Sequence, residues 1–170
     1  VISVMVDAPL AKLRSLCAPA TDIAITIPLP PIARGGCPLP VYPASPVLET
    51  LFGDRNLVLP QPSEAALNAH LAASALCSPI LDQLLVAADW LAGFTGNPAQ
   101  AEAYIVAMIR GYLPERVRGG DLAEALKKLS TEGGLNATLR KTMSAAREDL
   151  HHGLDGFRKR VGLPEDGGRA

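Results

Sequence analysis

The stretch AALNAHLAASALCSPILDQLLVAADWLAGF at residues 65–94 decides how this chain is organised. It predicts a helix that is apolar on nearly every side, with an irregularity near Pro79. Polar residues within its longest apolar run, residues 65–81, and Asp82 and Asp89 after that run favour a buried helix of a soluble protein over a membrane span. Because one small helical domain holds little material to cover such a helix, we expect burial against a second copy of the chain.

The composition changes near residue 62 and divides the sequence into two domains. Eleven of the fifteen prolines lie at or before Pro62, whereas the long helical patterns and most charges lie after it. We therefore expect a first domain at residues 1–61, a helical domain at residues 62–163 and a tail at residues 164–170, which is predicted to be frayed.

The first domain has the pattern of an α/β fold. Residues 1–6, VISVMV, are apolar and rich in β-branched side chains, which is typical of a strand buried on both faces of a parallel sheet. Further patterns predict helices at residues 8–16 and 46–52 and strands at residues 23–27, 39–42 and 56–59. These short strands are too few for a sheet covered on both faces, so we expect the natural protein to continue upstream of Val1.

The second domain is predicted to be all helical. Asn97, Pro98 and Gln100 mark the start of one helix, which Pro114 stops. A short helix is expected at residues 121–129. A last helix is expected to carry one apolar stripe from Leu139 to Val161.

Charge and cysteine content exclude several classes of protein. Sixteen basic and seventeen acidic residues give a net charge of -1, which argues against a nucleic-acid partner. The three cysteines are widely separated and none forms a CxxC motif, so neither a disulfide framework nor a metal site is expected. No signal peptide is recognisable in these residues, and a reducing cytoplasm is the expected location.

The loop at residues 131–136 is the polar segment that most clearly suggests a ligand-binding site. Two adjacent glycines, Gly133 and Gly134, allow the backbone to approach a ligand closely. Asn136, at the start of the last helix, would join main-chain N–H groups that suit a carboxylate. An ordinary helix connection that needs a positive φ and a cap explains the same residues about equally well.

The order of several motifs resembles the C-terminal two thirds of the pyrroline-5-carboxylate reductase family. These motifs are VISVM, PLAKLRSL, IPLPP at residues 27–31, GGCPLPVYP at residues 35–43, the helical segment from Ala65, and STEGGLN before the last helix. The resemblance implies an NAD(P)-binding Rossmann domain with a parallel sheet, followed by a helical dimerisation domain. It further implies NADP or NAD as cofactor, a GxGxxG motif upstream of Val1, and reduction of a cyclic imine to proline.

The resemblance also implies roles for individual residues. Pro28 and Leu29 correspond to the nicotinamide site and would contact the cofactor through their backbone. Ser74 matches the first serine of a Ser-Gly-Ser-Gly-Pro-Ala-Tyr turn and is expected to bind substrate. The segment at residues 131–136 matches a Ser-Pro-Gly-Gly-Thr-Thr loop that receives the substrate carboxylate, so substrate binding is expected at Thr131, Gly133, Gly134 and Asn136. No catalytic side chain is identified.

Several departures from the family pattern point to a divergent paralogue. Leu29 and Pro30 replace Asn and Thr, residues 75–77 replace Gly-Ser-Gly, and Leu135 and Asn136 replace two threonines. The first hypothesis is a homodimeric NAD(P)-dependent oxidoreductase for a small imine, keto or amino acid. The alternatives are a non-catalytic dimeric scaffold or regulatory paralogue that has lost the imine site, and an unrelated helical adaptor or chaperone.

Overall fold

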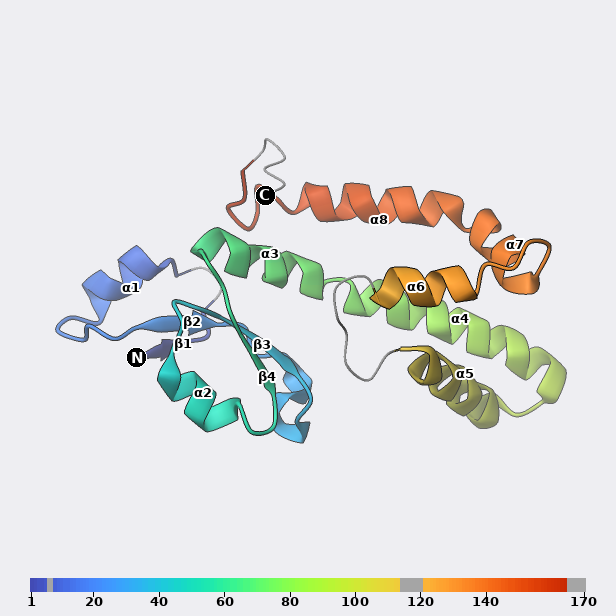
Figure 1. Cartoon of the computed structure of the whole chain (residues 1–170), viewed down its shortest axis with the longest axis horizontal. Coiled ribbons are helices and arrows are strands. Elements are labelled where there is room, and N and C mark those ends of the chain that lie inside the picture. Colours follow the sequence, from blue (N-terminus) through green and yellow to red (C-terminus); the bar gives the residue numbers. More distant parts are fainter. Residues whose placement is uncertain (6–7, 114–120, 165–170) are drawn as a thin grey trace. The chain divides into compact units, whose positions relative to one another are not determined.

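The computed structural model describes residues 1–5, 8–113 and 121–164 (Figure 1). Its contacts divide the chain into two compact units, Val1–Ser74 with Leu154–Ala170, and Ala75–Gly153. An α/β part followed by a helical region, as the sequence predicts, is therefore present. Each unit is described by itself below.

The first unit contains a mixed sheet of four strands, in the order β1-β2-β3-β4. The strands are β1 (Ile2–Ser3), β2 (Ala24–Thr26), β3 (Pro38–Tyr42) and β4 (Leu57–Pro60). β1 and β2 are parallel, as are β3 and β4, but β2 and β3 are antiparallel. The prediction of a purely parallel sheet was therefore wrong for the pair of β2 and β3. The connection between β2 and β3 holds only a short 3-10 helix, η1 (Pro30–Arg34), whereas a parallel crossover usually needs a full α-helix.

Helices cover both faces of this small sheet. The prediction that four short strands are too few for such a sheet was wrong. Alternate residues of β2 point to opposite faces. Ile25 packs in a cluster with Leu13 of α1 (Leu10–Leu16) and Leu67 of α3 (Glu64–Ser74). Ala24 packs with Leu48 of α2 (Pro46–Phe52) on the other face. The first unit is thus a three-layer α/β/α arrangement.

The first strand is shorter and more exposed than residues 1–6 predict. Within residues 1–5, which the structure describes, only Ile2–Ser3 forms a strand, and Ser3 is buried while Val1, Val4 and Met5 are more than half exposed. β1 lies at an edge of the sheet and pairs with β2 alone, so no described strand covers its outer side. The predicted burial on both faces is therefore absent at residues 1–5.

The apolar stretch at residues 65–94 forms two helices, as the irregularity expected near Pro79 indicates. α3 ends at Ser74 and α4 (Cys77–Thr95) starts three residues later. Pro79 lies in the first turn of α4, where its missing N–H costs no intrahelical hydrogen bond. α3, which the sequence places in the helical domain, contributes Leu67 to the core beneath the sheet.

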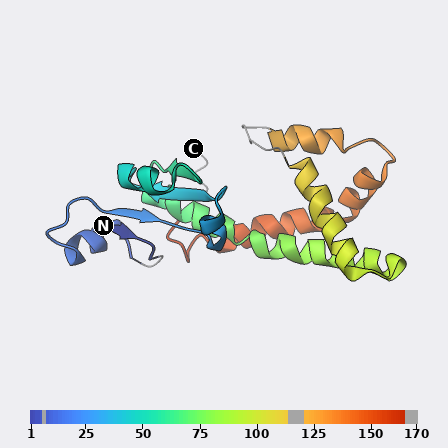
Figure 2. The ribbon, with the colours of Figure 1, turned by 90° about the horizontal axis from the view of Figure 1, so that it is seen from below.

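The second unit begins with a helical hairpin of α4 and α5 (Pro98–Tyr112), which Figure 2 shows folding back on each other. Gly96 ends α4 with φ at 65°, a conformation that favours glycine. Asn97 Oδ1 then accepts a hydrogen bond from Gln100 N–H at 3.1 Å, which confirms the predicted start of α5. The stop expected at Pro114 lies outside the described residues, and α5 ends at Tyr112 before it.

Within residues 121–164 the structure has three further helices, where two were predicted. α6 (Asp121–Lys128) agrees with the expected short helix. The prediction of a single last helix was wrong, because the chain forms α7 (Leu135–Thr142) and α8 (Ser144–Gly156) with a break at Met143. Met143 takes φ -90° and ψ 17°, and its neighbours Thr142 and Ser144 both have low helix propensity.

Candidate functional site

The glycine loop, residues 130–134, joins α6 to α7 in the second unit. Gly133 has φ of +72°, which other residues rarely adopt. Gly134 donates its N–H to Thr131 O at 3.1 Å and is the N-cap of α7. A Cβ built on Gly134 would lie 3.1 Å from that same oxygen, so a larger side chain here would need a small shift of the loop backbone. The two glycines therefore shape the start of α7.

The first turn of α7 is open to solvent. Leu135 is 90% exposed, and Asn136 is also exposed. The first backbone N–H groups of a helix lack intrahelical acceptors and carry partial positive charge. Asn136 adds an amide group to this turn, so the segment offers hydrogen-bond donors suited to an anion. The four residues of segment 131–136 that are expected to bind substrate, Thr131, Gly133, Gly134 and Asn136, thus occur together in the second unit.

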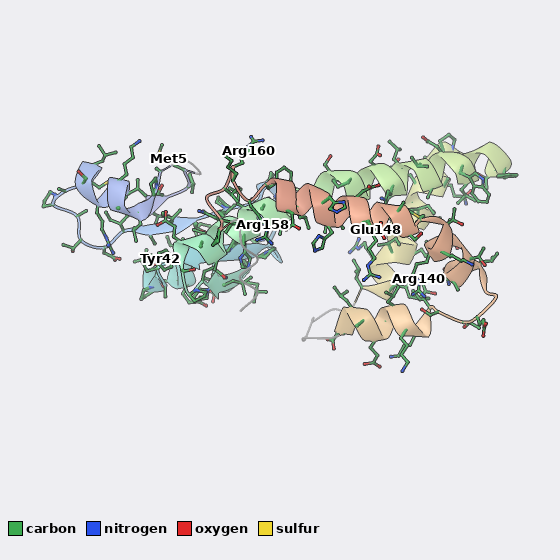
Figure 3. The ribbon with its side chains drawn as sticks, turned by 90° about the horizontal axis from the view of Figure 1, so that it is seen from above. Met5, Tyr42, Arg140, Glu148, Arg158 and Arg160 are labelled. Carbon is green, nitrogen blue, oxygen red and sulfur yellow. The ribbon has the colours of Figure 1, made fainter. Side chains whose placement is uncertain are left out.

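Arg140 lies one helical turn after Asn136 and contacts the glycine loop. Its Nη1 donates to Ser130 Oγ at 2.7 Å, and Ser130 Oγ in turn donates to Leu126 O at 2.5 Å. Figure 3 shows Arg140 between α7 and α6. Arg140 could not be singled out from the sequence, where it is one of several charged residues on the polar side of the predicted last helix. The spacing of four residues from Asn136, which places both on one helix face, was the available signal.

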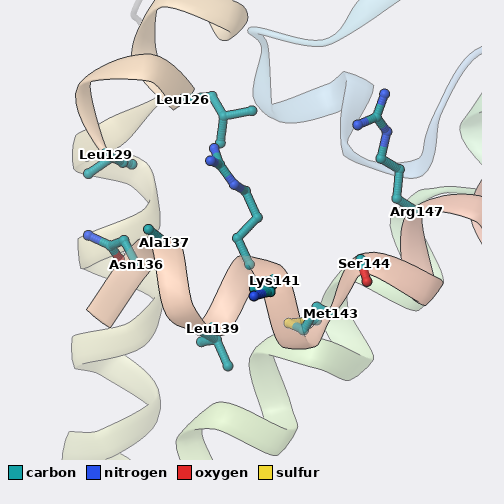
Figure 4. Close-up of a pocket in the computed structure, with 10 residues that line it drawn as sticks. Leu126, Leu129, Asn136, Ala137, Leu139, Lys141, Met143, Ser144 and Arg147 are labelled. Atoms are coloured by element: carbon teal, nitrogen blue, oxygen red, sulfur yellow. The ribbon is translucent and has the colours of Figure 1, made fainter. Parts of the chain in front are cut away.

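An open groove of about 890 Å³ lies beside these residues in the second unit (Figure 4). Its described lining carries three cationic side chains and no acidic one. Its apolar lining comes from α6 and from the segment around the break between α7 and α8. The lining residues are Leu126, Leu129, Asn136, Ala137, Leu139, Arg140, Lys141, Met143, Ser144 and Arg147. Cations beside exposed apolar side chains suit a molecule that has an anionic group and an apolar body.

Pro28 and Leu29, the residues expected near a nicotinamide, lie in the first unit just after β2. They follow the carboxyl end of β2, the same edge at which the parallel β1 ends. Ligands of open α/β sheets bind outside this edge. Pro28 is exposed and has no N–H, and Leu29 O accepts a hydrogen bond from Ile32 N–H at 3.0 Å.

Ser74 is the last residue of α3 and belongs to the first unit. Its side chain is half-buried, and its Oγ donates to Leu71 O at 2.6 Å. The hydroxyl proton is thus used within its own helix, and a ligand would find the oxygen as an acceptor. This geometry gives Ser74 a weaker basis for binding an anion than the glycine loop has.

No group of three or more His, Cys, Asp or Glu side chains that could hold a metal occurs in the part of the chain that the structure describes. The three cysteines are unpaired thiols. One helical stretch, Glu64–Thr95, is long and apolar enough to cross a membrane by length and composition, with a mean hydropathy of 1.6. Core helices of soluble proteins meet the same criterion, so this stretch does not by itself assign a membrane.

Comparisons with protein-family models, with curated proteins and with solved structures found no match for the chain. The motifs and the geometry of the two units are therefore the basis for the function proposed below.

Proposed function

We propose that the protein is an NAD(P)-dependent oxidoreductase resembling pyrroline-5-carboxylate reductase, which acts on a small imine, keto or amino acid. The observation that carries this proposal is the glycine loop, whose Gly133 and Gly134 present the open start of α7 beside a cationic groove. A carboxylate-bearing substrate needs such donors. The motif order places this loop where the family binds its substrate carboxylate.

The first unit offers a matching place for the cofactor. Pro28 and Leu29 lie at the carboxyl edge of two parallel strands, where nicotinamide cofactors bind in related folds. When bound, NAD(P)H supplies the hydride for the C=N or C=O carbon. The residues of this chain would hold the substrate carboxylate and orient the acceptor carbon, which is the main contribution of the protein to such a reaction.

A homodimer through the helical domain is part of the proposal. α4 buries only Ala88, while Trp90 and Phe94 are 68% and 77% exposed. The rings of Trp90 and Phe94 contact each other at a centroid distance of 5.0 Å, with their planes tilted by 57°. Further exposed apolar side chains on this hairpin are Leu81, Leu85, Val86, Tyr104 and Tyr112. Many exposed apolar side chains on one helical hairpin are typical of a protein interface.

The test is NAD(P)H oxidation by the protein at its natural length with a panel of cyclic imines and keto acids, including pyrroline-5-carboxylate. Turnover with at least one compound, together with a rise in melting temperature on adding NADPH or NADH, is the expected result. No turnover and no nucleotide-dependent shift in melting temperature would refute the proposal.

A non-catalytic dimeric scaffold or regulatory paralogue is the second candidate. Leu135, which is 90% exposed, occupies a position where the family has a threonine hydroxyl. The hydroxyl of Ser74 donates to its own helix. Nucleotide binding without turnover across the whole panel is the result that would favour this candidate over the enzyme.

A further inference from the structure

We infer that the groove formed by α6, α7 and α8 determines the substrate class: Arg140 binds the substrate carboxylate, and the groove accepts an apolar body larger than a five-membered ring. This inference rests on the proposed reductase function and adds a specificity to it. Neither the glycine loop nor the cofactor residues alone would indicate this specificity.

Arg140 has the geometry of a positioned carboxylate ligand. Its Nη1 donates to Ser130 Oγ at 2.7 Å, and the Ser130 hydroxyl is itself held by Leu126 O at 2.5 Å. This chain of two hydrogen bonds at the surface orients the guanidinium toward the glycine loop. A guanidinium carries five N–H donors in a planar fork, so donors remain for a bidentate bond to a carboxylate.

The charges that line the groove favour an anion. Lys141 and Arg147 line the same groove, and none of its described lining residues is acidic. Nearby on α6, Glu124 is paired with Lys128 at 2.9 Å, so this carboxylate has a cation of its own. Cations gathered along one concave surface raise the local concentration of anionic ligands.

The apolar part of the groove indicates the rest of the ligand. Leu126 and Leu139 are at least half exposed, and Met143 is 41% exposed, beside the three cations. Sites of 300–1,000 Å³ hold molecules of about drug size. A five-membered imino acid would leave most of the 890 Å³ groove and its apolar surface in contact with water. A bicyclic or aryl-substituted imino acid would cover the leucines and the methionine.

The first test measures binding to the full-length protein by calorimetry. The probes are proline, the bicyclic amino acid octahydroindole-2-carboxylate, and octahydroindole, which lacks the carboxylate. The bicyclic acid is expected to bind at least about tenfold more tightly than either other probe, because each of the others loses one half of the interaction. Equal affinity of the bicyclic acid and octahydroindole would overturn the role of Arg140. Equal affinity of the bicyclic acid and proline would overturn the inference that the groove prefers a large apolar body.

The second test uses variants. Arg140→Met is expected to weaken binding of the bicyclic acid at least about tenfold, and Arg140→Lys less so because a lysine keeps the charge but not the fork. Arg110→Met on α5, which removes an exposed arginine outside the groove, is the matched control and should change binding less than about twofold. Unchanged binding in Arg140→Met would overturn the inference. If that variant does not fold, Arg140→Lys and the probe comparison decide.

Activity assays separate this inference from the proposed function. NADPH-dependent turnover of bicyclic imino acids with a KM that rises in Arg140→Met and a kcat that changes little supports both. Tight binding of the bicyclic acid without turnover by the wild-type protein would refute the reductase and leave the groove specificity standing. Turnover with the same KM in Arg140→Met would keep the reductase and refute the groove specificity.

Discussion

The carboxylate of Glu64 accepts a hydrogen bond from the backbone N–H of Leu10 at 3.1 Å, so the start of α3 caps the start of α1. Pro9 precedes α1 and has no side chain that could accept such a bond. Both helices pack on the same face of the sheet through Leu13 and Leu67. The bond therefore joins two segments that are far apart in sequence at the point where their shared core begins.

Removing this carboxylate is expected to destabilise the first unit. Glu64→Ala leaves a half-buried N–H at the start of α1 without its partner, and the loss of a cap of this kind costs about 1 to 2 kcal/mol. Glu64→Gln keeps an oxygen acceptor and should lose less. Urea unfolding monitored by far-UV circular dichroism measures both variants. Equal stability of Glu64→Ala and the wild type would show that water replaces the carboxylate at no cost.

The packing of α2 on the sheet gives a second prediction. Leu48 is fully buried against β3, whereas Leu51 on the same helix is 63% exposed. Leu48→Ala creates a cavity and is expected to lower the free energy of unfolding by about 2 to 5 kcal/mol. Leu51→Ala is the control and should change it by no more than about 0.5 kcal/mol. Similar losses in both variants would mean that α2 is not packed by Leu48.

Helices whose ends carry chemical signals could be predicted from the sequence. Pro46 at the first helical position marks α2, and Asn97 with Pro98 marks α5, and both helices occur as predicted. The break at Met143 could not be predicted, because Met143 continues the apolar stripe of the last helix while its own backbone leaves the helical conformation. A pattern of apolar side chains predicts which side of a helix is apolar. It does not predict where the helix backbone is interrupted.

The relative direction of neighbouring strands could also not be predicted from the sequence. Residues 23–27 and 39–42 are correctly predicted as strands, but a short apolar run has no mark that distinguishes a parallel from an antiparallel neighbour. Within the candidate site, Gly133 could be found from the sequence because its positive φ favours glycine. Arg140 was missed because its position depends on Ser130, ten residues earlier in the chain.

The cap of α5 gives a third prediction. Asn97 Oδ1 accepts from Gln100 N–H at 3.1 Å, and the backbone N–H of Asn97 donates to Thr95 Oγ1 at 3.4 Å. Asn97→Ala removes the cap and is expected to cost about 1 kcal/mol, whereas Asn97→Asp and Asn97→Ser keep an acceptor and should cost little. Thermal unfolding of the three variants measures the difference. A loss in Asn97→Asp as large as in Asn97→Ala would contradict the capping role.

The exposed face of α4 gives a fourth prediction, which tests the proposed homodimer. Trp90→Glu places a charge on the apolar surface that Trp90 forms with Phe94. Because an unpaired charge at an interface is costly to desolvate, this variant is expected to sediment as a monomer where the wild type sediments as a dimer. The control is Leu51→Glu, a comparable change of an exposed leucine on α2 in the other unit, which should leave the dimer intact. A wild type that sediments as a monomer at all concentrations would refute the dimer.

The glycine loop gives the last prediction, since two glycines of the second unit make a matched pair. Gly133 has φ of +72°, so Gly133→Ala forces a strained backbone at a cost of about 1 to 2 kcal/mol and should displace the start of α7. Gly153 lies inside α8 with nothing within 4 Å of an added Cβ, so Gly153→Ala is expected to stabilise its helix by about 0.5 to 1 kcal/mol. If the loop binds the substrate carboxylate, Gly133→Ala weakens binding of octahydroindole-2-carboxylate in calorimetry while Gly153→Ala leaves it unchanged. If the loop is only a helix connection, Gly133→Ala loses stability and keeps its affinity for the ligand.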